Sequence, residues 1–119
     1  MTQYHEPFEE LSDHDRNLHR ALTSFKEEIE AIDWYHQRVV CCKDEQLRAI
    51  LAHNRDEEIE HACMVLEWLR RNMPGWSEQL RTYLFTEAPV LEVEEAMESR
   101  SESSTPSRDL AIGSLKGAE

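Results

Sequence analysis

The sequence predicts an all-α protein, built on an antiparallel hairpin of two long helices with a short C-terminal helix after it. Three observations carry this prediction. The chain of 119 residues has only three glycines and four prolines, and no proline lies between Phe8 and Met73. Apolar residues in that span recur every three or four positions, which is the period of one helix face. Asn72-Met73-Pro74-Gly75 then supplies a stop signal.

The first long helix is expected over residues 12–41 and the second over residues 44–72. Ser12 can cap the first helix, with the acidic Asp15 near its positive end. Asp44 can cap the second in the same way. Because the break between the two helices is only two or three residues long, they must run antiparallel.

The rest of the chain differs from this hairpin in composition. We expect residues 1–11 to form an N-terminal arm and residues 12–88 to form the helical domain, which includes a third helix at 77–85. Residues 89–108 are acidic and rich in serine, which predicts a disordered linker. Residues 109–119 regain apolar side chains without a local partner, which indicates a segment that docks elsewhere.

Charge and cysteine content narrow the possible functions. The formal net charge of -12 disfavours nucleic acid and anionic membranes as partners, and favours a cation or a cationic partner. No apolar run could span a bilayer and no secretory signal is evident, so a cytoplasmic protein is expected. Cys41, Cys42 and Cys63 show no CxxC spacing, which favours reduced structural thiols.

Each long helix carries ligand-type residues within a stripe of mostly apolar positions. The first stripe has Glu28 at its middle, and the second contains Glu58 and His61. A carboxylate in such a seam is costly unless it is paired or binds metal, and neither stripe contains a lysine or arginine. Carboxylates with one imidazole suit iron or manganese. The stripes are Ala21, Phe25, Glu28, Ile32, Tyr35 and Val39, and Leu47, Leu51, Asn54, Glu58, His61, Val65 and Trp68.

These residues amount to half of a known metal site. Di-metal four-helix bundles take one Glu from each of two helices and a Glu-x-x-His from each of the other two. The chain has Glu28 and a single Glu-x-x-His, formed by Glu58 and His61. A two-fold dimer would supply the second half, giving a ferritin-like four-helix bundle whose four carboxylates balance two ferrous ions.

Other residues near these stripes are open to two interpretations. Tyr35 lies on the Glu28 stripe, where it either serves a metal ligand or simply packs in the core. Glu27, Glu30 and Trp34 share a neighbouring face, whose acids either attract incoming cations or form a solvated strip.

The residues that carry these patterns resemble those of the encapsulated ferritins. The resemblance is closest in EEIEAIDWY at residues 27–35 and HNRDEEIEH at residues 53–61, and it covers residues 15–88. It includes LEWLRR at 66–71 and LRTYLFTE at 80–87, and residues 109–117 resemble the peptide that directs cargo into encapsulin shells.

The resemblance implies that Glu28, Glu58 and His61 bind a di-iron centre, Fe(II)/Fe(III), at a dimer interface with Tyr35 beside it. It also implies an outer metal site formed by Glu27, Glu30 and Trp34. The implied assembly is a homodecameric ring of five dimers. Its implied activity is that of a ferroxidase, which oxidises Fe(II) with dioxygen and leaves iron storage to the encapsulin nanocompartment around it.

Two alternatives remain open. The chain could be a non-enzymatic acidic metal-binding or adaptor protein whose helices dimerise only to bury their stripes. A di-metal site could also work with manganese or reduce peroxide, because the ligand types narrow the metal without fixing it.

Overall fold

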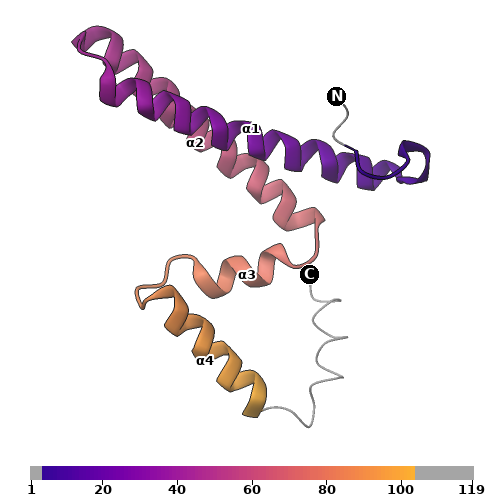
Figure 1. Ribbon diagram of the computed structural model, residues 1–119. Helices are drawn as coiled ribbons and strands as arrows, with labels where there is room; N and C mark the ends of the chain where they lie inside the picture. Colours follow the sequence, from indigo (N-terminus) through magenta and orange to yellow (C-terminus); the bar gives the residue numbers. More distant parts are fainter. Residues whose placement is uncertain (1–3, 104–119) are drawn as a thin grey trace. The chain divides into compact units, whose positions relative to one another are not determined.

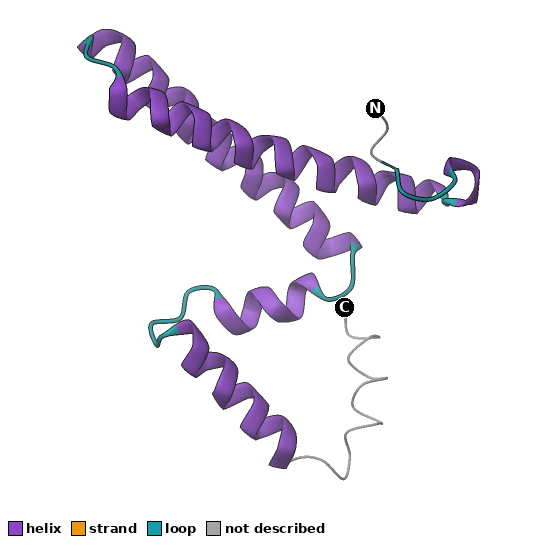
Figure 2. Cartoon of the chain, viewed as in Figure 1, coloured by secondary structure: helices purple, strands orange, loops and turns teal. Residues whose placement is uncertain are grey.

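The computed structural model describes residues 4–103, which form α-helices and one short 3-10 helix and contain no strand. Helix α1 (Asp13–Cys41) and helix α2 (Glu45–Asn72) lie side by side as a hairpin, followed by α3 (Trp76–Tyr83) and α4 (Val90–Ser103) (Figure 1, Figure 2). The predicted all-α class is confirmed. The chain divides into two compact units, Met1–Asn72 and Met73–Glu119.

The predicted helix starts are set by side-chain caps. Ser12 Oγ accepts a hydrogen bond from the backbone N–H of Asp15 at 3.0 Å, and the Asp15 carboxylate accepts one from the Ser12 N–H at 3.4 Å. This is a capping box, which satisfies two N–H groups at the start of α1. Asp44 Oδ1 accepts from the N–H of Leu47 at 3.0 Å and so caps α2.

Contacts within the first unit establish its antiparallel arrangement. His14 Nε2, in the first turn of α1, lies 3.1 Å from the carbonyl oxygen of Asn72 at the end of α2. The short 3-10 helix η1 (Phe8–Glu10) is held against α1, because Arg16 donates a hydrogen bond to the Phe8 carbonyl at 2.7 Å. Its guanidinium also lies 3.7 Å from the centre of the Phe8 ring. The N-terminal segment therefore folds back on the hairpin.

The hairpin has very little core of its own. Among residues 4–103 the only buried apolar side chains are Ala62 and Leu69, both on α2, and α1 has no buried residue. None of the helices in this range is long and apolar enough to cross a membrane. Large apolar side chains are instead exposed along both helices, at Leu22, Ile29, Trp34, Val40, Leu47, Ile50, Ile59, Met64 and Trp68.

The segment after α3 corrects one prediction. Residues 90–103 form helix α4, where the sequence predicted a linker over 89–108. The Pro89 carbonyl accepts hydrogen bonds from the N–H groups of Glu92 and Val93, at 2.9 and 3.1 Å, and so begins the helix. The prediction was wrong for these residues because it gave acidic and serine content more weight than helix propensity, which is high for Glu, Leu, Ala and Met.

Helix α3 also differs slightly from its predicted bounds of 77–85. It begins at Trp76, directly after Gly75, whose φ of 106° is accessible to glycine. It ends two residues early because Leu84 has an extended backbone, with a ψ of 147°, and Phe85 follows with a φ of 61°. The expected docking segment, 109–119, lies outside the described residues, as do residues 104–108 of the expected linker.

Candidate metal centre

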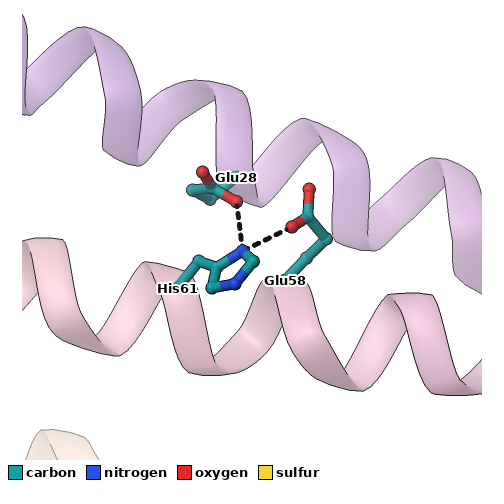
Figure 3. A group of neighbouring side chains, drawn as sticks. All are labelled: Glu28, Glu58 and His61. Carbon is teal, nitrogen blue, oxygen red and sulfur yellow. Dashed lines mark hydrogen bonds and ion pairs between the residues drawn. The ribbon is translucent and has the colours of Figure 1, made fainter.

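Three predicted ligands meet between α1 and α2. Glu28 comes from the middle of α1, while Glu58 and His61 lie one turn apart on α2 (Figure 3). His61 Nδ1 lies 2.7 Å from Glu58 Oε1 and 3.7 Å from Glu28 Oε2. One ligand atom from each residue can be chosen so that all three lie within 4.8 Å of one another. Within residues 4–103, this is the one such group of three or more metal-ligand side chains.

Helix periodicity explains why these side chains converge. Residues three apart on a helix share a face, so Glu58 and His61 both point toward α1. Glu28 occupies the matching position on α1, and 24% of its side chain is exposed. The seam between the helices thus holds two carboxylates and one imidazole.

The electrostatics of the group fit a cation. Glu28 Oε2 is buried and has no hydrogen-bond partner, an arrangement that proteins generally avoid. Burial raises the pKa of Glu28, and the nearby Glu58 carboxylate raises it further. The hydrogen bond to Glu58 is the main cause of the raised pKa of His61. Without a cation, Glu28 and His61 therefore bind protons more readily than usual. A divalent ion would instead bind the Glu28 oxygen that has no hydrogen-bond partner and neutralise both carboxylates.

Tyr35 lies close to these ligands. It lines a cavity of about 390 Å³ together with Glu58 and His61. The guanidinium of Arg38, one turn later on α1, lies 5.2 Å from the centre of the Tyr35 ring. The same cavity is completed by His53, Asn54 and Glu57.

The remaining predicted site residues do not join the ligand group. Glu27 and Glu30 are exposed on α1, and Trp34 is 52% exposed. Glu27 still acts on the centre, since its charge contributes to the raised pKa of Glu28. Cys41, Cys42 and Cys63 are free thiols.

Sequence reasoning missed a second line of side chains behind His61. Glu57 Oε2 lies 4.0 Å from His61 Nε2, and Glu57 Oε1 lies 3.1 Å from His53 Nε2. The three residues are spaced four apart on α2, so they share one face. That spacing is visible in the sequence, but it did not single these residues out, because the acidic and polar residues around them resemble an ordinary solvated helix face.

Most of the chain matches the model of one protein family. The model of the EncFtn-like family matches residues 3–87. The chain belongs to the EncFtn-like family. The predicted resemblance to the encapsulated ferritins is thereby confirmed.

Relatives of this EncFtn-like chain cover nearly its whole length. It is 63% identical over 113 residues to a ferritin-like protein of Thermotoga maritima, an alignment that covers 95% of this chain and 97% of the relative. It is 54% identical over 123 aligned positions to the encapsulated ferritin-like protein of Rhodospirillum rubrum, with 95% of this chain and 87% of that protein covered. Membership of this family supports an iron-related function.

A solved structure shares the fold of this EncFtn-like chain. A crystal structure of a Nitrosomonas europaea protein matches it with a TM-score of 0.72 and 57% sequence identity. The match covers 75% of this chain and 98% of that one. A quarter of the present chain therefore has no counterpart in that structure.

Proposed function

We propose that this protein is a ferroxidase, which oxidises Fe(II) to Fe(III) with dioxygen at a di-iron site shared by two copies of the chain. The observation that carries the proposal is the group formed by Glu28, Glu58 and His61, with its buried and unpartnered carboxylate oxygen. Hard carboxylate oxygens with one imidazole are a ligand set suited to iron.

Two features support a site shared between copies. One chain offers two carboxylates and one imidazole at the group, which is too few ligands to hold two iron ions. Two copies would offer four carboxylates, whose charge balances two ferrous ions. The apolar side chains left exposed along α1 and α2 supply the surface that a partner would bury. We extend this proposal to a ring-shaped homodecamer of five such dimers.

The chain's own residues would act mainly by binding and orientation. Glu28 and Glu58 would hold substrate Fe(II) and favour the Fe(III) product, because hard oxygen ligands bind the more highly charged ion more strongly. Two ferrous ions held together would each give one electron to one dioxygen, which takes up two protons and leaves as hydrogen peroxide while both ions become Fe(III). His61 must release its Nδ1 proton to become a ligand, so binding is coupled to proton release.

We assign the surrounding residues to supporting roles. Exposed Glu27 and Glu30, with Trp34, would form an outer metal site through which iron reaches the centre. Tyr35 would act beside the ligands, since it lines a cavity with Glu58 and His61.

The chemistry is tested by aerobic Fe(II) oxidation, followed by absorbance and oxygen consumption, on variants checked for assembly. Glu28→Ala and His61→Ala should fall to the uncatalysed rate, while the matched controls Glu60→Ala and His36→Ala should keep wild-type turnover. Wild-type rates in assembled Glu28→Ala or His61→Ala protein would refute the site assignment. Iron binding without faster oxidation would favour a metal buffer, and faster turnover with manganese would change the proposed substrate.

We propose further that the protein works inside an encapsulin shell, where the ferric product is mineralised. The name of the Rhodospirillum rubrum relative, an encapsulated ferritin-like protein, supports this partner. Residues 109–117 would bind the shell. Deleting residues 109–119 should leave iron oxidation unchanged and abolish co-purification with a co-expressed shell protein, and retained encapsulation would contradict this role.

A further inference from the structure

We propose that Glu57, supported by His53, is a positioning residue that holds the His61 ring with Nδ1 toward the metal. The inference rests on the proposed metal function of Glu28, Glu58 and His61, and adds a role for two residues outside that group.

The two ring nitrogens of His61 face different surroundings. Nδ1 points toward Glu58 Oε1 at 2.7 Å and Glu28 Oε2 at 3.7 Å, which makes it the atom aimed at a shared cation (Figure 3). Nε2 points the other way, with Glu57 Oε2 at 4.0 Å. This separation is longer than a hydrogen bond, and we infer that a small turn of the His61 ring closes it when metal binds, since that side chain is 45% exposed.

A carboxylate beside Nε2 can prepare the His61 imidazole to bind metal through Nδ1. A neutral ring has one protonated nitrogen and one free lone pair, so a metal on Nδ1 requires the proton to sit on Nε2. An acceptor at Nε2 favours that tautomer and fixes the plane of the ring. Glu57 is the acceptor that the structure offers there.

His53 completes the arrangement by restraining Glu57. Its Nε2 lies 3.1 Å from Glu57 Oε1, which leaves Oε2 directed at His61. His53, Glu57 and His61 follow one another at four-residue intervals along α2. A single rigid helix therefore carries the ligand, its orienting carboxylate and the partner of that carboxylate.

The test uses zinc bound to the assembled full-length protein, because zinc is diamagnetic and needs no oxygen. Metal affinity is measured by competition with a chelator. The tautomer of His61 is read by solid-state NMR of ¹⁵N-histidine-labelled protein, with His61→Ala to assign the signal. The variants are Glu57→Ala, Glu57→Gln and the matched control Glu60→Ala, which removes an exposed glutamate from the same helix.

Wild-type protein, Glu57→Gln and Glu60→Ala should all show a metal-bound Nδ1 and a protonated Nε2, because the glutamine carbonyl can still accept from Nε2. Glu57→Ala should bind zinc about tenfold more weakly and show a shifted Nε2 signal, because the Nε2–H no longer has a carboxylate beside it. Equal affinity and an unchanged His61 signal in Glu57→Ala would overturn the inference. So would equal losses in the Ala and Gln variants, since charge rather than orientation would then be responsible. A wild-type His61 signal that does not respond to zinc would refute the metal centre itself.

Discussion

Two proton-binding equilibria at the candidate centre act in the same direction. The pKa of Glu28 is raised, mainly by burial, and that of His61 is raised, mainly by its hydrogen bond to Glu58. A group whose pKa is higher in the folded state than in the unfolded state stabilises the fold at low pH. That contribution is lost as the pH rises through the folded-state pKa. The contribution of the metal-free centre to the free energy of unfolding should therefore decrease as the pH rises from acidic to neutral.

This predicts an unusual effect of Glu28→Gln. At neutral pH and without metal, the variant should unfold a few degrees higher than the wild type, because a neutral amide removes the repulsion from Glu58 and can donate to it. Below the ordinary glutamate pKa of 4.5 the difference should vanish, since both side chains are then neutral. Thermal unfolding followed by circular dichroism in a chelator tests this, with Glu60→Gln as control. A variant less stable than the wild type at both pH values would contradict it.

Metal should reverse the order of stability. A ligand that binds only the folded state at 100 times its Kd stabilises by about 2.7 kcal/mol. Saturating Zn(II) at neutral pH should therefore raise the unfolding temperature of the wild type well above that of Glu28→Gln. Equal shifts in the two proteins would place the bound ion elsewhere.

At the residue scale, sequence patterns predicted Glu28, Glu58 and His61 because each is a polar ligand inside an apolar stripe. Glu57 and His53 could not be predicted in the same way. They lie on the more exposed face of α2, where charged side chains are common and periodicity does not distinguish an orienting carboxylate from a solvated one.

At the element scale, local capping chemistry fixed the starts of the two long helices. Ser12→Ala should lower the free energy of unfolding by about 1 kcal/mol, because the Asp15 N–H loses its acceptor at the start of α1. Ser12→Asn should keep most of the stability, since asparagine caps equally well. Urea denaturation measures both, and an Ala variant as stable as the Asn variant would argue against the capping box.

Helix α4 gives the second prediction at this scale. Ala96→Pro should reduce the helical circular dichroism signal by several residues, because proline interrupts a helix of 14 residues near its middle. Ala96→Leu keeps a helix former and should leave the signal unchanged. If residues 90–103 were instead a flexible linker, the two variants would give the same spectrum.

Caps were readable from the sequence because they depend on a few adjacent residues, as at Ser12 and Asp44. Helix α4 was harder to predict, because Val93 and Met97 reach α3 only once both helices exist, lining a groove with Thr82. The exposed acidic residues of α4 gave this stretch of sequence a composition typical of a disordered segment. The helix propensity of the residues in this segment, summed over its length, favours a helix, and the prediction gave it too little weight.

At the scale of the whole molecule, the lack of a core predicts that folding depends on association. With Ala62 and Leu69 as the only buried apolar side chains among residues 4–103, one hairpin alone has little to hold it together. The unfolding temperature of metal-free protein should fall by several degrees over a hundredfold dilution. Calorimetry and sedimentation at matched concentrations test this. A dilution-independent unfolding temperature would indicate a chain that is stable as a monomer.

Each chain brings one Glu28, one Glu58 and one His61 to the candidate centre. If two chains complete each centre, a mixture of intact and defective chains loses working centres faster than it loses intact chains. In a cell that makes both intact and ligand-deficient chains, which pair at random, the share of fully intact centres equals the square of the intact fraction. The fraction of centres that a defective allele inactivates would therefore exceed the fraction of chains that it encodes. A beneficial substitution at a ligand position would, in the same way, change both halves of each centre.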